Sequence, residues 1–135
     1  MREFEFTCPF PLTLNHAWLQ HGQRRFRKRD YIKYERDIAE ILKGVKMDDG
    51  YYCVTIDLFP PNRRIYDADN RIKTLLDAMT RCGFWADDSL VNEIIVRKGL
   101  PIIDESCAVV SVKVMDNPYF LIPENYGLQT KVYKN

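Results

Sequence analysis

Four aspartates of this 135-residue chain form two close pairs in the sequence, Asp67 with Asp69 and Asp87 with Asp88. Carboxylate oxygens are the ligands that Mg²⁺ prefers, and a site of two or three aspartates plus a substrate phosphate suits an ion that keeps several of its waters. Such an ion orients an attacking water and stabilises the charge that develops on a phosphate. Lys73, four residues after Asp69, would add a cation beside the phosphate oxygens. These residue types indicate metal-dependent phosphodiester hydrolysis.

A short amphipathic helix separates the two pairs. Apolar residues recur at offsets of three, four and seven, and Gly83 follows where a left-handed residue commonly ends a helix. The recurring residues are Ile72, Leu75, Leu76 and Met79. A helix of about twelve residues is roughly 18 Å long, so the aspartates at its two ends meet only if the chain doubles back. Carboxylates about 5 Å apart repel by roughly 3 kcal/mol per pair at an effective dielectric near 20, and a divalent cation removes that penalty.

Ordinary structural roles explain the same residues when each is taken alone. Asp69 and Asn70 stand where the N-cap of the helix is expected. Lys73 is four residues from both Asp69 and Asp77, a spacing that surface ion pairs readily explain. The second aspartate pair fits a turn. Spacing alone therefore favours the structural interpretation over the catalytic one.

The remaining periodicity predicts a small α+β (α/β) fold. Alternation and β-branched runs predict strands over residues 3–8, 52–60, 90–98 and 107–115. A second amphipathic helix is expected over residues 30–45, because apolar residues recur there every three or four positions. The order βαβαββ indicates a mixed sheet of about four strands with two main helices. We expect the strands at 90–98 and 107–115 to pair with each other.

A basic cluster lies in a segment that we expect to form a loop. Pro9 and Pro11 interrupt regular pairing, so residues 9–29 should run without strands. The net charge of the whole chain is only +1, yet residues 21–29 hold five basic side chains and no acidic one: Arg24, Arg25, Arg27, Lys28 and Arg29. Closely spaced cations displace condensed counterions from DNA. We predict that this cluster binds DNA phosphates, assisted by Arg63 and Arg64.

Length and composition narrow the class of protein. A chain of 135 residues fits one domain, and 46% hydrophobic with 29% charged residues is ordinary for a globular protein. No apolar run approaches the roughly 20 residues of a membrane span, and residues 1–8 lack the apolar segment of a signal peptide. We therefore expect a cytoplasmic protein with no membrane partner. Four scattered cysteines without metal-binding spacing indicate buried free thiols: Cys8, Cys53, Cys82 and Cys107.

An ordered set of motifs connects the candidate residues: a basic lead-in, DxDN, a lysine on the next helical turn, D-A-[LM], then G-[FW]-x-x-D-D. In this chain the motifs are Arg63 and Arg64, Asp67 to Asn70, Lys73, Asp77 to Met79, and Gly83 to Asp88. The set closely resembles the signature of the RusA family of Holliday-junction resolvases. The N-terminal PFPLTLNHAW is also similar to the family's opening segment, and agreement spans about residues 4–115.

The resemblance implies site roles that spacing does not. It gives the metal-ligand roles to Asp67, Asp69 and Asp88, with Mg²⁺ as the ion and Mn²⁺ as an alternative. It gives Lys73 a supporting catalytic role. We further expect Asp87 and Asn70 to contact the metal ligands and support them without binding the ion directly.

The resemblance also implies a biological setting. Proteins of this family are bacterial or phage-encoded homodimers that resolve four-way DNA junctions by paired symmetric nicks, in recombination and repair. A two-fold dimer with two active sites matches a nearly two-fold symmetric junction. We expect a RusA-like endonuclease domain over residues 1–115 and a C-terminal extension over 116–135, docked on the body or at a partner interface.

Two alternatives remain at this stage. The chain could be a non-catalytic module that binds branched or single-stranded DNA through the basic cluster. It could also be a metal-dependent nuclease that prefers flaps or single strands.

Overall fold

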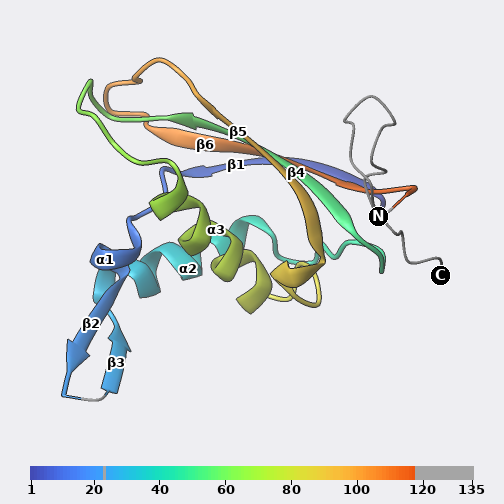
Figure 1. The fold of residues 1–135 in the computed structure, drawn as a ribbon, viewed down its shortest axis with the longest axis horizontal. Coiled ribbons are helices and arrows are strands. Elements are labelled where there is room, and N and C mark those ends of the chain that lie inside the picture. Colours follow the sequence, from blue (N-terminus) through green and yellow to red (C-terminus); the bar gives the residue numbers. More distant parts are fainter. Residues whose placement is uncertain (23, 118–135) are drawn as a thin grey trace, which may run out of the picture.

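A four-stranded mixed sheet forms one layer of the protein (Figure 1). The computed structural model describes residues 1–22 and 24–117. The strands lie in the order β1 (Glu3–Pro9), β6 (Cys107–Val114), β4 (Tyr52–Phe59) and β5 (Val91–Lys98). β6 pairs antiparallel with both β1 and β4, whereas β4 pairs parallel with β5. The predicted α+β class with a mixed four-stranded sheet is confirmed.

Two main helices cover one face of the sheet, α2 (Arg29–Ile41) and α3 (Asp69–Arg81). A four-residue helix α1 (Leu14–Ala17) precedes them, and a 3₁₀ turn η1 (Asp88–Leu90) leads into β5. In the main layers the order βαβαββ is as predicted. No helix among residues 1–22 and 24–117 is both long and apolar enough to cross a membrane.

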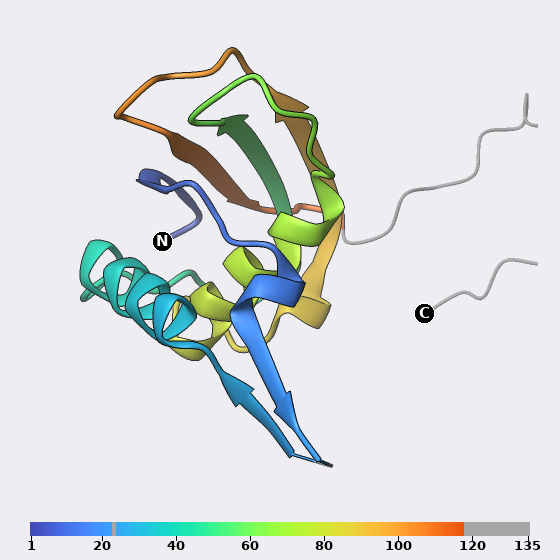
Figure 2. The same ribbon diagram turned by 90° about the vertical axis from the view of Figure 1, so that its left-hand side faces the viewer.

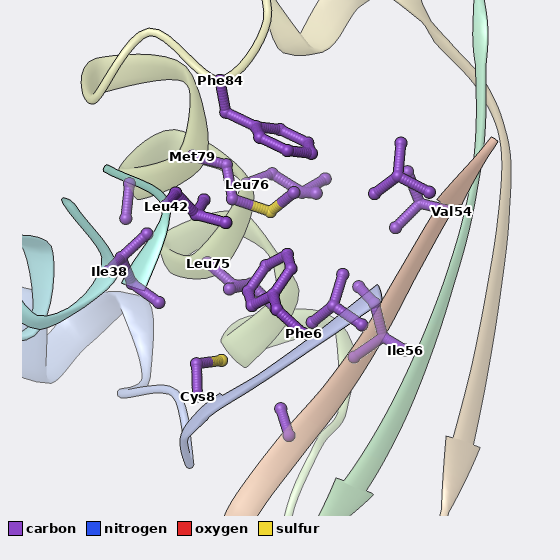
Figure 3. Packing of buried hydrophobic residues seen from close by; sticks show 14 of the residues in the cluster. Phe6, Cys8, Ile38, Leu42, Val54, Ile56, Leu75, Leu76, Met79 and Phe84 are labelled. Atoms are coloured by element: carbon purple, nitrogen blue, oxygen red, sulfur yellow. The ribbon is translucent and has the colours of Figure 1, made fainter. Parts of the chain in front are cut away.

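The core lies between the sheet and these helices (Figure 3). Alternate residues of β4 point inward and are buried, as the period of two in a strand requires. Leu75 and Met79 of α3 are fully buried against this layer. Each such side chain stabilises the fold by roughly 1.5–3 kcal/mol relative to full exposure. This packing fixes α3, and with it the candidate site, relative to the sheet.

The prediction that residues 9–29 form a loop without strands is wrong. The Thr13 side chain accepts a hydrogen bond from the His16 backbone N–H and caps α1, after which β2 (Trp18–His21) and β3 (Arg24–Arg27) form an antiparallel hairpin. Gly22 takes φ +62° at the turn, a conformation that hairpin turns need and that glycine adopts without strain. The hairpin projects from the body and carries part of the basic cluster (Figure 2).

The expected pairing of the last two strands is also wrong, because β4 lies between β5 and β6. β4 and β5 are joined through α3, and a helical crossover makes its two strands parallel neighbours. β5 is thereby left at the edge of the sheet.

The four cysteines are free thiols, but only Cys8 is buried, while the other three are half-buried. From residue 118 onward, the expected C-terminal extension lies outside the described residues.

Candidate active site

α3 is held at its first turns by the N-terminal segment. Thr74 is fully buried, and its hydroxyl donates a hydrogen bond to the Leu12 carbonyl at 2.8 Å. Arg71 donates to the Pro11 carbonyl at 2.7 Å, and its guanidinium lies over the Phe10 ring. These contacts fix the helical turn from which Lys73 projects.

The chain reverses direction immediately after α3. Gly83 takes φ +82° just past the helix end, as predicted for a helix-terminating glycine. Trp85 is buried, stacks on Tyr52 at 5.4 Å between ring centroids and donates from Nε1 to the Thr80 hydroxyl at 2.7 Å. This anchor turns the chain back along α3, so the doubling back that the sequence required takes place.

Lys73 and Asp88 meet as a result. The ammonium of Lys73 lies 2.9 Å from Asp88 Oδ2 and 2.8 Å from Asp77 Oδ1. The hydrogen bond to Asp77 has the largest effect on the pKa of Lys73 and the hydrogen bond to Asp88 the next largest, and both raise it. The side chain therefore stays charged throughout the neutral range. Asp77 and Lys73 both lie on α3 and Asp88 lies in η1, so the ion pairs connect α3 to η1.

Asp67 and Asp69 lie exposed at the start of α3. The N-cap position is Ala68, without a side-chain cap, so the expectation that Asp69 or Asn70 caps the helix is wrong. Asp69 is instead the first helical residue, and its Oδ1 accepts a hydrogen bond from the Asn70 backbone N–H at 2.9 Å. A carboxylate in the first turn also interacts favourably with the helix dipole. Both aspartates are accessible to a ligand from solvent.

Asp87 has a local role. Its side chain accepts a hydrogen bond from the Ser89 backbone N–H at 3.4 Å and caps η1. The hydrogen bond with Ser89 also lowers the pKa of Asp87. Asp87 therefore shapes the 3₁₀ turn that presents Asp88.

The donor chemistry of the three candidate ligands suits a hard divalent cation, because Asp67, Asp69 and Asp88 offer only carboxylate oxygens. Across the described ranges, however, no group of three or more His, Cys, Asp or Glu side chains is arranged closely enough to hold a metal ion. The Lys73 ammonium instead occupies one oxygen of Asp88. The residue types fit a metal, and binding one requires these side chains to rearrange.

A basic groove runs beside the hairpin. It encloses about 640 Å³ and is lined by Arg27, Arg29, Ile32, Lys33 and Arg36. Lys33 and Arg36 were not predicted to bind DNA, although with Arg29 they have the spacing of one helix face. Arg27 is paired with the buried Glu35 at 2.8 Å.

The other predicted DNA contacts are more scattered. Arg24 is exposed near the hairpin tip and Lys28 lies half-buried before α2, while the side chain of Arg25 lies outside the description. Arg63 and Arg64 are exposed in the segment between β4 and α3, and neither forms an ion pair within the described part of the chain.

In this small α+β domain, acidic and basic side chains lie together on and beside α3, and metal-dependent phosphodiester hydrolysis uses side chains of these types. The model of the endodeoxyribonuclease RusA family matches residues 9–115. The chain belongs to this family.

Individual relatives agree with this assignment. The chain is 30% identical over 105 residues to the crossover junction endodeoxyribonuclease RusA of Enterobacteria phage HK97, covering 76% of this chain and 88% of the relative. Proteins of the same name from Enterobacteria phage 82 and Escherichia coli K12 are 32% and 31% identical over 101 residues, covering 73% of this chain and 84% of each relative.

Proposed function

We propose that this chain is a divalent-metal-dependent endonuclease that resolves four-way DNA junctions. Family membership supports the substrate, since the relatives are named as crossover junction endodeoxyribonucleases. The contact between Lys73 and Asp88 is the structural observation that carries the proposal. It brings Lys73, in the second turn of α3, together with Asp88 of η1, fifteen positions later in the sequence.

In this proposal Asp67, Asp69 and Asp88 hold Mg²⁺ or Mn²⁺. The bound ion supplies a centre that activates water and stabilises phosphate charge. Metal binding at Asp88 would require Lys73 to give up its ion pair there, whereas the pair with Asp77 could remain. The Lys73 ammonium would then be available to stabilise negative charge on the phosphate in the transition state.

The basic side chains position the DNA. The basic groove and the exposed arginines of the hairpin neutralise phosphates on the arms of the junction. Two copies of the chain acting across a two-fold axis would make paired nicks in opposing strands. We place this activity in the cytoplasm of a bacterial or phage-infected cell, because the relatives come from bacteria and phages.

A cleavage assay tests the proposal. Purified protein with Mg²⁺ should nick a synthetic four-way junction symmetrically, and Asp69→Asn should abolish nicking while junction binding remains. Asp37→Asn, which removes a carboxylate from an exposed pair on α2, serves as the matched control and should cut normally.

An intact junction, under conditions in which a known resolvase cuts it, would contradict the proposal. Binding without cutting by the unaltered protein would favour a non-catalytic DNA-binding module. Preferential cutting of flaps would favour a different nuclease.

A further inference from the structure

Three large aliphatic side chains point into solvent from two neighbouring loops. Ile65 is 99% exposed, Leu100 is 83% exposed and Ile103 is 77% exposed. Isolated exposed aliphatic residues are ordinary, but a gathered set indicates a contact surface. None of these residues was singled out by the motif analysis, and none belongs to the candidate metal site.

The two loops are fixed to each other. Residues 60–68 and 99–106 lie side by side at one end of the sheet in both views (Figures 1 and 2). The Gly99 backbone N–H donates to the Leu58 carbonyl at 2.7 Å, and that of Ile102 donates to the Pro60 carbonyl at 2.9 Å. Lys98 donates from Nζ to the Tyr66 carbonyl at 2.6 Å. These hydrogen bonds fix the two loops to the sheet and to each other, so the exposed aliphatic side chains lie on a surface of defined shape.

Two adjoining hollows occupy this surface, and we refer to them together as the loop hollow. Their volumes are about 380 and 430 Å³. Both are lined by Asn62, Arg63, Leu100 and Pro101. Both hollows are open to solvent, and each volume lies within the range of small-ligand pockets, roughly 300–1,000 Å³. The shared lining combines apolar walls, one amide and one guanidinium.

The charge and position of the loop hollow fit a nucleotide. Arg63 and Arg64 at its edge are free of ion pairs within the described residues and can bind phosphate. Ile65 is only two residues from Asp67. Apolar wedges that enter DNA between base steps are commonly formed by Ile, Leu and Pro, and bases unstack most easily where stacking is already interrupted.

We propose that the loop hollow receives an unstacked nucleobase from the branch point of the junction, with Leu100 and Ile103 against its face and Arg63 and Arg64 on the flanking phosphates. This inference rests on the proposed function and deepens it, because it explains how the protein distinguishes a branch point from continuous duplex. A second copy of the chain fits this surface less well. A two-fold contact centred here would bring the arginines of both copies together.

A fluorescence experiment tests the base contact. The protein would carry Asp69→Asn to prevent cutting, and the probe would be a four-way junction with 2-aminopurine at the branch point. Leu100→Ser combined with Ile103→Ser should lower junction affinity on the order of 10-fold, as expected when one stacked base loses its contact. The change in 2-aminopurine fluorescence on binding should disappear, while affinity for linear duplex stays within about 2-fold because phosphate contacts remain. Ile41→Ser, at another exposed aliphatic residue, is the matched control and should behave as the parent.

The outcomes separate the two proposals. If the parent protein does not bind the junction, both the proposed function and this inference fail. If the double variant keeps full affinity and the full fluorescence change, only the inference fails. Sedimentation shows whether the double substitution converts a dimer to a monomer, which would identify the surface as a subunit contact and overturn the inference. Thermal unfolding monitored by circular dichroism checks that both variants fold.

Discussion

Lys73 Nζ lies 2.9 Å from Asp88 Oδ2, although the two residues come from different elements. A cation of the protein itself therefore neutralises a carboxylate that we assign to a metal ion. Lys73 is 53% exposed and Asp88 21% exposed, so the ion pair is partly screened by solvent. In the proposed function, metal binding competes with a weak contact that water can replace.

Replacing Lys73 should separate metal binding from cutting. Lys73→Met removes the competitor for Asp88, so Mn²⁺ should bind up to about 5-fold more tightly, as expected for the loss of a pair worth roughly 0.2–1 kcal/mol. Junction cleavage should fall on the order of 100-fold or more, because a cation near the transition state is lost. Calorimetry measures the first effect and single-turnover cleavage the second. Lys43→Met, at an exposed lysine in the turn that follows α2, is the control. Weaker Mn²⁺ binding by Lys73→Met would contradict the competition.

Replacing Asp77 should have the opposite effect on the metal. Asp77→Asn leaves Asp88 as the one carboxylate paired with Lys73 among the described residues, so Mn²⁺ binding should weaken by a few-fold. Cleavage should also slow, because Lys73 loses the partner that holds it when the ion binds. The sign of the change in Mn²⁺ affinity distinguishes this role from a purely structural one. Equal affinities in Asp77→Asn and the parent would show that Asp77 does not position Lys73.

The sequence predicted the layers of the fold because those layers follow from periodicity. The alternation of β4 and the spacing of α3 reappear as buried faces. The pairing of β5 was not predictable in the same way, since local pattern does not say which strand becomes the central one. The hairpin was missed because its strands are only four residues long and strongly basic.

The candidate site was predictable in composition but less so in arrangement. Motif resemblance selected Lys73 and Asp88, and their contact depends on the turn that Trp85 anchors. No sequence rule fixes which carboxylate a flexible lysine selects, so its ion pair with Asp88 was not foreseen. The ion pair of Lys73 with Asp77 was expected from their spacing of four residues on a helix, but that spacing gave no reason to assign Asp77 a role at the site.

The position of the basic hairpin formed by β2 and β3 should depend on one buried carboxylate. Glu35 of α2 is 7% exposed and forms ion pairs with Arg27 of β3 at 2.8 Å and with Arg81 of α3 at 2.5 Å. Glu35→Gln should reduce the free energy of unfolding by about 1–3 kcal/mol, because two guanidiniums lose a charged partner but recover water. Urea unfolding measures this loss. Trypsin should also cleave the hairpin faster.

Asp37→Asn is the matched control for that substitution, since Asp37 lies on the same helix in an exposed pair with Lys33. It should cost about 0.5 kcal/mol or less. If the two substitutions reduce the free energy of unfolding equally, the ion pairs of Glu35 do not hold the hairpin against the helices.

Alkaline pH should destabilise the protein through Cys8. Burial raises the pKa of its thiol from 9.0 to about 12. Between these values the unfolded chain releases the thiol proton while the folded chain keeps it, so the free energy of unfolding falls as pH rises. The contribution is fully present below pH 9 and is lost toward pH 12. Cys8→Ala should make the decline shallower by up to about 1.4 kcal/mol per pH unit in this window. Urea unfolding at several pH values measures the slopes, with pH 7 as the internal reference because the thiol is protonated in both states there. Parallel declines in the two proteins would show that the folded state ionises Cys8 as easily as the unfolded chain does.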